Sequence, residues 1–441
     1  MKTFSKIEIN TDLDNIIPYL EDVHPNPFAN ILKSEFEEKI NFAKNNVFNN
    51  MSLLDFYFLA APIVSSLKDG HTGLDFPIDV LKELNPFVFP FKLSFRNNKI
   101  YSLDNQKSIP ADAEIIRINN QDSSEIIKSL NSLISAENEH FKLNLLSKYF
   151  YDFFEYKEEY IVEYLYKNEI KNIILKGIRF KKIIENEKQP NSTKKEYYSY
   201  SFIENNTALF NFNSFVDYEK FVVFLKDMFQ EFNDRNVQNV IIDIRENGGG
   251  NSLLGEELLQ YISNKNFFSY GIEITKYSEK RKDFYDNVMR EGVLSYLTEK
   301  EYKNLFKYKN GTLIIDKEFE EIKLRENRLR FKGKVFLLTS NYTFSSATDF
   351  AYNFQFLNIG KVIGEKTGGS IVSFGDVITT TLPETNMNLY ISHREFYPYG
   401  TTEKDRRPVK PEYEIESEKA LDFTINLIEK QKINLTSARS K

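Results

Sequence analysis

The 441-residue chain contains no cysteine and no tryptophan. Without cysteine there is no disulfide framework, no thiolate nucleophile and no cysteine-based zinc site. Only four histidines are present, and none of them forms an HExxH pair or a similar ligand pair. The sequence therefore predicts neither a catalytic metal nor an organic cofactor.

Strong charge and long apolar runs are also lacking. The net charge is -6, and no basic stripe runs along the chain, which argues against a nucleic-acid partner. No apolar run is long enough to span a membrane. The first residues, MKTFSKIEINTDLDN, lack the apolar core of a signal peptide, so the sequence shows no signal peptide and leaves the compartment open.

Residues 1–80 are predicted to form a helical domain. Helical spacing of apolar residues should end at His24, just before a proline pair. A very apolar segment, 53–67, predicts another helix, which Pro62 should kink or split. Gly70 is placed to end that helix as its C′ residue.

Residues 86–205 are predicted to form a β-rich middle domain. Alternation over 92–103 around an Asn-Asn pair indicates a hairpin, and a second alternating stretch covers 160–180. The polar segment 185–196 indicates an exposed loop or linker.

Residues 206–430 follow a β-α-β pattern, with 431–441 as a tail. The mostly apolar strand expected at 239–244 is typical of a parallel sheet that is covered on both faces. The fold class predicted for this part is an α/β core. The segment 265–331 is expected to be an insertion that shapes a cleft or lid.

The stretch 334–349, KVFLLTSNYTFSSATD, carries the first candidate site. It predicts a buried strand, a loop and a helix that starts near Ser346, whose hydroxyl would lie among backbone N–H groups and beside the helix dipole. Acyl transfer needs such an arrangement of nucleophile and donors. The alternative is an ordinary helix cap, since Ser346 and Asp349 also resemble a capping box.

Two further features point to chemistry. The glycine run 248–250 lies between a strand and a helix, where it can allow close approach of a ligand or another backbone. A phosphate loop, a tight packing turn and an oxyanion contact remain open, although no GK[ST] or GxGxxG follows. His71, just after Gly70, can reach beyond its own segment, but a lone histidine is more often structural.

Taken together, four segments resemble the tail-specific, C-terminal-processing serine peptidases. The match is best with their tricorn-core-like branch, which includes interphotoreceptor retinoid-binding protein. The four segments occur in the family's order and are LKDGHT at 67–72, IDIRENGGG at 242–250, TFSSATD at 343–349 and GEKTGG at 364–369.

The resemblance implies roles for individual residues. Ser346 matches the nucleophile, with Ser345 as a rival that lies four rather than three residues before the acid at Asp349. His71 matches the general base, and an imidazole suits that role because its pKa lies near neutral pH. His24, His140 and His393 are not expected to take part, because their neighbours in sequence offer no partner.

The resemblance also implies an oxyanion hole and a supporting acid. The backbone N–H groups of Gly249 and Ala347 would form the hole. Asp405, with Glu403 as the alternative, takes the position of the acid that supports the base.

The chain departs from the family at several positions. The other branch uses a Ser–Lys dyad, but its lysine position holds Ser370 here, and Lys366 lies off that position. Tricorn-like enzymes have a serine where this chain has Gly70. The first departure favours His71 as the base over a lysine, whereas Gly70 leaves the supporting residues incomplete.

The implied fold is a crotonase-like, ClpP/crotonase-type ββα core with a helical N-terminal domain and a middle domain that is possibly PDZ-like. The implied function is a serine-type endopeptidase acting on proteins or peptides. The alternative is a catalytically inactive protein that binds a peptide or an apolar ligand on the same fold. Family analogy suggests an exported bacterial protein, and the oligomeric state stays open.

Overall fold

The computed structural model describes residues 2–104, 108–187, 196–204, 206–290, 299–317 and 320–439, so most of the predicted linker at 185–196 lies outside it. The chain forms two compact units. The first unit combines Met1–Thr193, Ile274–Ile314 and Phe374–Glu395, and the second combines Lys194–Glu273, Ile315–Ser373 and Phe396–Lys441. The sequence-based division into consecutive domains stays a prediction.

Helices open the first unit, as predicted. They are α1 (Lys6–Val23), α2 (Lys33–Asn45) and α3 (Leu53–Ser65), and a short strand pair, β1 (Thr3–Phe4) and β2 (Met51–Ser52), links two of their ends. Helix α1 ends with His24 as its C-cap, which confirms the predicted boundary. A capping box between Ser5 and Glu8 satisfies backbone N–H groups at its start.

Two expectations for the third helix differ from the structure. The predicted split at Pro62 is wrong, because α3 runs through Pro62: most side chains of this helix are buried, and their packing outweighs one missing hydrogen bond. A kink at Pro62 stays a prediction. The helix ends at Ser65, and the residue with positive φ that follows it is Lys68, at +54°, rather than Gly70.

An antiparallel sheet of six strands forms the next part of the first unit. Its order is β10-β9-β7-β6-β5, with β8 on β7. The predicted hairpin at 92–103 is confirmed, since Asn97 and Asn98 both have positive φ in the turn, as a type I′ turn requires. The strands are β5 (Leu93–Arg96), β6 (Lys99–Ser102), β7 (Glu114–Ile118), β8 (Gln121–Asp122), β9 (Glu159–Tyr166) and β10 (Glu169–Lys176).

Several shorter elements complete this region. Helices α5 (Ser123–Asn131) and α6 (Glu139–Phe153) pack on the six-stranded sheet, and the sequence did not predict α6. The others are α4 (Ile78–Leu84), α7 (Phe180–Glu187), β4 (Phe87–Val88) and β11 (Ile178–Arg179).

Later segments of the chain add a third sheet, of order β16-β15-β20-β19, with β3 on β20. Its strands are β3 (Gly73–Leu74), β15 (Ile272–Tyr277), β16 (Thr312–Asp316), β19 (Ser373–Thr381) and β20 (Asn388–Tyr397), and α10 (Glu279–Arg290) and α11 (Glu299–Lys307) lie between β15 and β16 in sequence. The pairing of Leu74 with Leu389 ties the turn after α3 to β20.

The second unit is built on a mostly parallel sheet of order β12-β13-β14-β17-β18-β21. Only the β12–β13 pair is antiparallel. The strands are β12 (Tyr198–Ile203), β13 (Thr207–Phe212), β14 (Asn239–Asp243), β17 (Lys334–Thr339), β18 (Gly360–Gly364) and β21 (Tyr413–Glu414). The predicted parallel α/β architecture is confirmed for this unit.

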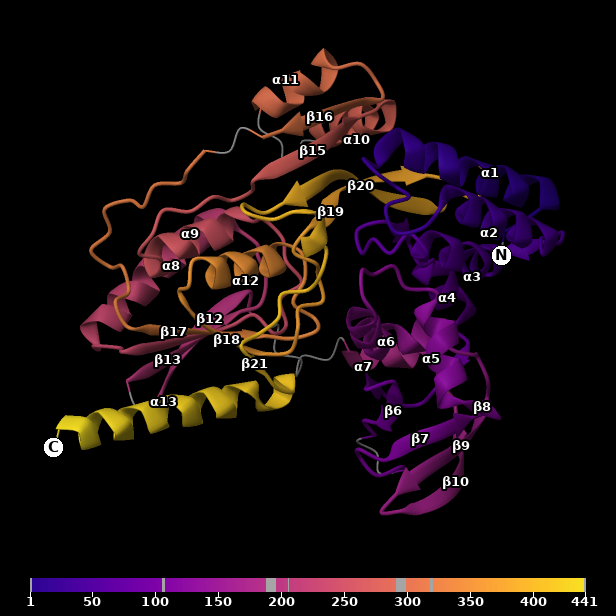
Figure 1. Cartoon of the computed structure of the whole chain (residues 1–441). Helices are drawn as coiled ribbons and strands as arrows, with labels where there is room; N and C mark the ends of the chain where they lie inside the picture. The colour runs from indigo at the N-terminus through magenta and orange to yellow at the C-terminus, as the bar shows by residue number, and fades with distance from the viewer. Residues whose placement is uncertain are drawn as a thin grey trace. The chain divides into compact units, whose positions relative to one another are not determined.

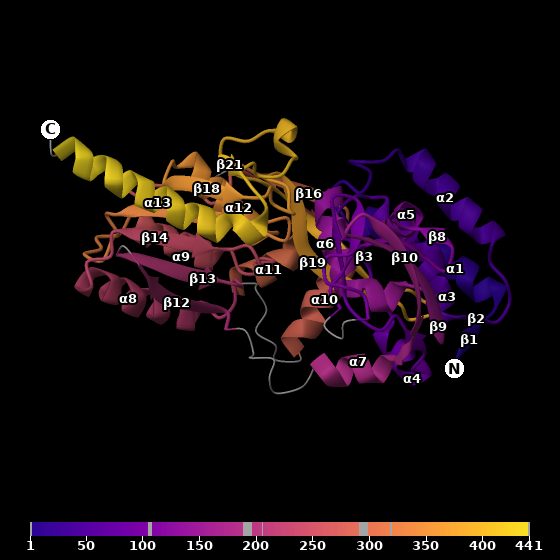
Figure 2. The same cartoon turned by 90° about the horizontal axis from the view of Figure 1, so that it is seen from below.

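Helices cover both faces of this sheet (Figure 1). Residues such as Phe210, Ile242 and Leu337 pack with α8 (Tyr218–Asp234), α9 (Leu253–Ile262) and α12 (Ser346–Phe356). Their strand neighbours Ile241 and Phe336 point the other way and pack under α13 (Ser417–Arg439), which crosses the sheet in Figure 2. Burial of successive strand residues on both faces explains the apolar run seen in the sequence.

None of the helices in the described part of the chain is both long enough and apolar enough to cross a membrane.

Candidate active site

Ser346 lies where β17 gives way to α12. It is the first residue of α12, and Ser345 before it is the N-cap, without a capping hydrogen bond from its side chain. The alternative that Ser346 is an ordinary N-cap is therefore wrong, because Ser345 takes the N-cap position. Ser345 has φ +54° and ψ −131°, a region that costs a non-glycine residue about 1–3 kcal/mol and that is common at functional sites.

The glycine loop after β14 lies directly against this turn. Ser346 is only 7% exposed, and its hydroxyl donates to the Gly250 carbonyl at 2.6 Å. Gly249 has φ +98°, and a Cβ there would come within 2.8 Å of the Ser345 Cβ. The structure thus places the predicted nucleophile beside the glycine run, and the close approach requires glycine.

The two predicted oxyanion donors are engaged inside this loop structure. The Gly249 N–H donates to Asn247 Oδ1 at 2.9 Å, and the Ala347 N–H donates to the Phe344 carbonyl at 3.2 Å. The described conformation therefore turns both N–H groups towards the protein. Because the Gly248–Gly249 peptide joins two glycines, its rotation is sterically cheap.

A cavity of about 20 Å³ adjoins Ser346, which is room for about one water molecule. Tyr270 and Asp349 line it, and the Tyr270 hydroxyl donates to Asp349 Oδ2 at 3.1 Å. Burial raises the pKa of Asp349 to about 7. The carboxyl one helical turn after the nucleophile is thus largely protonated below neutral pH.

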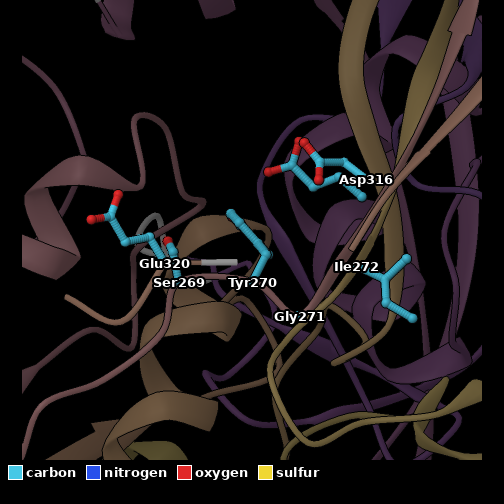
Figure 3. A pocket seen from close by; sticks show the side chains of 7 residues that line it. Ser269, Tyr270, Gly271, Ile272, Asp316 and Glu320 are labelled. Atoms are coloured by element: carbon cyan, nitrogen blue, oxygen red, sulfur yellow. The ribbon is translucent and has the colours of Figure 1, made fainter. Parts of the chain in front are cut away.

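A larger cavity of about 180 Å³ shares Ser269 and Tyr270 with the first one (Figure 3). Three carboxylates line it, from Glu273, Asp316 and Glu320. Its described lining residues include no lysine or arginine.

His71 lies in the first unit, in the turn between α3 and β3. Its backbone N–H donates to Asp69 Oδ1 at 2.9 Å. The other oxygen of Asp69 accepts from His24 Nε2, Thr72 Oγ1 and Ser392 Oγ at 3.2, 2.5 and 2.7 Å. Asp69 therefore joins the turn that contains His71 to His24 at the end of α1 and to Ser392 on β20.

The electrostatics of this turn keep His71 neutral and Asp69 ionised. Burial lowers the pKa of His71, against the opposing effects of Asp69 and Asp376. Burial alone would raise the pKa of Asp69, but hydrogen bonds from His24 and Thr72 and the nearby imidazoles hold it well below its usual range. A neutral imidazole is the form that can accept a proton.

Asp69, His71 and Glu137 offer ligand atoms that lie within 4.8 Å of one another. The residue types would suit a divalent cation. However, both oxygens of Asp69 already accept hydrogen bonds, and one of them lies 4.0 Å from His71 Nδ1. The arrangement fits support of the imidazole better than a metal site.

Sequence reasoning missed part of this network. His24 was expected to lack a partner, but it is 1% exposed and contacts Asp69, 45 residues later. Asp69, in the DGHT motif, was the one signal in the sequence. Its carboxylate can accept more hydrogen bonds than the donors of its own turn provide, which indicates a donor from elsewhere in the chain.

The other predicted site residues have local partners in the second unit. Asp405 accepts from the Thr402 N–H at 3.0 Å and pairs with Arg407 at 3.1 Å. Glu403 pairs with Arg406 at 2.8 Å, and Lys366 lies 3.5 Å from Glu414. The carboxylates of Asp405 and Glu403 thus bind groups of their own loop. A role of Asp405 in supporting the general base stays a prediction.

A scan against protein families matches residues 206–415 to the model of peptidase family S41. This stretch is similar to the S41 peptidases. It contains Ser346, the glycine loop and Asp405, whereas His71 lies before it. The resemblance to the tail-specific peptidases is confirmed at the level of the S41 family, and this match supports a peptidase function.

Solved structures show the same fold along nearly the whole chain. Mature CPAF complexed with lactacystin matches with a TM-score of 0.65 at 12% identity, with 98% of each chain covered. Mature CPAF alone matches with a TM-score of 0.62 at 12% identity, with 94% of each chain covered. At this identity the likeness shows the fold alone, and the S41 assignment rests on the family model. No curated protein sequence matches the chain.

Proposed function

We propose that the chain is a serine-type endopeptidase with Ser346 as nucleophile and His71 as general base. One observation carries the proposal: Ser346 opens α12 after the loop that follows the parallel strand β17, and it touches the glycine loop, inside the S41 stretch. This arrangement supplies a hydroxyl with backbone N–H groups around it.

In the proposed reaction, Ser346 Oγ attacks the carbonyl carbon of the scissile peptide bond. His71 takes the hydroxyl proton and then gives it to the leaving amine, and water hydrolyses the acyl-enzyme. The N–H groups of Gly249 and Ala347 hold the oxyanion of the tetrahedral intermediate. Asp69 positions His71 through its backbone, and Asp405 stays the proposed late acid.

Three rearrangements must precede this chemistry. The Ser346 hydroxyl has to leave the Gly250 carbonyl, the Gly249 N–H has to leave Asn247, and the Ala347 N–H has to leave the Phe344 carbonyl. Rotation of the Gly248–Gly249 peptide achieves the second change. We therefore propose that the described conformation is a resting state, which bound substrate converts into the active one.

The finer fold assignments are part of the same proposal. The sheet and helices of the second unit support a crotonase-like core, and the six-stranded sheet with α5 and α6 supports a PDZ-like middle domain. The substrates would be proteins or peptides, and the site would be that of an exported bacterial enzyme.

Labelling with a fluorophosphonate, read as intact mass, tests the assignment. We expect the parent protein to gain one adduct and Ser346→Ala to gain none. His71→Ala should label at least about 100-fold more slowly, because general-base catalysis contributes about that much or more. Ser345→Ala is the matched control and should still label.

The outcomes separate the possible assignments. Labelling of Ser346→Ala but not of Ser345→Ala would move the nucleophile to Ser345. A normal rate in His71→Ala would remove His71 as the base and turn attention to Lys366.

The second candidate is a binding protein on the same fold. The observation that favours it is the closed site, in which hydroxyl and N–H groups all have partners within the protein. Saturable binding of a peptide, with no labelling and no turnover of a peptide library, would establish this function in place of catalysis.

A further inference from the structure

A cationic side chain is enclosed within the first unit, on α10. Arg281 is only 2% exposed, and its Nε and Nη1 atoms are buried without a hydrogen-bond partner in the described structure. A buried charge without a counter-charge is strongly unfavourable, and buried donors are normally satisfied. This position therefore calls for an acceptor.

The surroundings of Arg281 offer rings and a second cation. Its guanidinium lies 4.6 Å from the ring centroid of Tyr277 and 5.7 Å from that of Tyr285. Burial lowers the pKa of Arg281, the charge of Arg394 lowers it further, and the two tyrosines raise it. No carboxylate is among these described groups. Ring contacts and a hydrogen bond with Tyr277 offset part of the cost of burial, but Nε and Nη1 stay without a partner in the described structure.

His393, on β20, also has a buried polar atom without a hydrogen-bond partner in the described structure. It is fully buried, its Nε2 lies 3.0 Å from the Tyr285 hydroxyl, and its Nδ1 has no partner in the described structure. When Tyr285 donates to Nε2, the neutral ring carries its proton on Nδ1, which becomes a donor.

The second cation near Arg281, the guanidinium of Arg394, has a carboxylate partner of its own. Arg394 Nη1 pairs with Asp376 Oδ2 at 3.1 Å, which balances one of the two positive charges. Among the described groups that shift the pKa of Arg281, no carboxylate balances its charge.

We propose that Arg281 and His393 form a binding site for a small oxyanion, a carboxylate or a phosphate group, between α10 and β20. One such group would accept from the guanidinium and from the imidazole, and it would neutralise the remaining charge. Guanidinium groups favour this chemistry because their N–H donors match carboxylate and phosphate oxygens. The site is independent of the proposed peptidase chemistry.

Equilibrium urea unfolding of the full chain is a suitable test, because the unfolded chain gives the anion free access to the enclosed residues. The midpoints would be compared in sodium phosphate, sodium acetate and sodium chloride at equal ionic strength. We expect phosphate or acetate to raise the midpoint in a saturable manner. At an anion concentration 100 times the Kd, the ratio of folded to unfolded protein should rise about 100-fold.

Three variants make the test specific to the site. Arg281→Leu should lose the anion effect and, in chloride, should be at least as stable as the parent, because it removes an unpaired buried charge. His393→Phe keeps that charge and should weaken binding about tenfold. Arg328→Leu removes an exposed arginine and should keep the full effect.

Each outcome decides the proposal. An effect of phosphate alone, or of acetate alone, supports it and identifies the source of the oxyanion. An equal effect in Arg281→Leu, or no effect of either anion on the parent, overturns it, as does a crystal structure with only water beside Arg281.

Discussion

At the scale of single residues, the candidate site depends on side chains that are buried and polar. Ser346, Asp69 and Asp349 are each enclosed by groups that decide their protonation or their orientation. Burial makes each of these effects larger than it would be at the surface. Asp349 gives the clearest consequence for stability.

We expect Asp349 to make the folding stability depend on pH. Burial raises its folded-state pKa from 3.8 to about 7. Between these values the folded state binds more protons than the unfolded state, so the free energy of unfolding falls as pH rises from about 4 to 7. Asp349→Asn should remove this dependence and gain on the order of a few kcal/mol relative to the parent between pH 4 and 8.

Urea unfolding at pH 5, 6, 7 and 8 measures the effect. Asp234→Asn, which changes an exposed aspartate at the end of α8, is the control and should follow the parent at every pH. A constant difference between Asp349→Asn and the parent across this range would contradict the prediction.

At the scale of elements, two loops that follow parallel strands build the nucleophile site. The loop after β14 carries the glycines, and the loop after β17 carries the serines. Thr343 Oγ1 donates to the Ile244 carbonyl at 2.9 Å, and the Phe344 N–H donates to the Asn247 carbonyl at 3.1 Å. These bonds hold the two loops together, so a change in one loop should disturb the other.

Replacement of Gly249 by alanine should damage both stability and labelling. The residue has φ +98°, and its new Cβ would lie 2.8 Å from the Ser345 Cβ and 2.9 Å from the Phe344 carbonyl oxygen. We expect a loss of about 2–4 kcal/mol in the free energy of unfolding, together with loss of fluorophosphonate labelling.

Gly248→Ala is the matched control in the same loop. Its Cβ would come no closer than 3.8 Å to Tyr342, an ordinary contact, so the loss should stay below about 1 kcal/mol. Equal stability of the two variants in urea unfolding would show that the loops do not pack as described.

At the scale of the whole molecule, each of the two compact units has a core of its own. Phe210 lies in the core under α8, α9 and α12, and Phe36 lies in the core of the N-terminal helices. The proposed nucleophile and base belong to different units, so the proposed catalysis requires both units to be folded.

We expect two unfolding transitions in scanning calorimetry, because separate cores unfold as separate cooperative units. Phe210→Ala should lower the midpoint of one transition and Phe36→Ala that of the other, each at a cost of about 3–5 kcal/mol. Phe42→Ala, at a position that is 71% exposed, should change neither. A single transition shifted by both core variants would contradict the prediction.

The sequence predicted the elements that depend on local pattern. Apolar runs and alternation located most strands, and the Asn-Asn pair located its hairpin. The predicted split of the helix at Pro62 was wrong, and helix α6 was not predicted. A prediction from neighbouring residues alone leaves out the packing energy that residues from elsewhere in the chain contribute.

The sequence by itself determined the parallel sheet, the helix beginning at Ser346 and the glycine turn at 248–250 between a strand and a helix, because each follows from residues close together in the chain. Tertiary structure alone decided that Ser346 donates to Gly250, that His24 supports the turn of His71 and that Arg281 is enclosed. These contacts join residues 45 to 96 positions apart, or depend on burial by several elements, and no local periodicity records either condition.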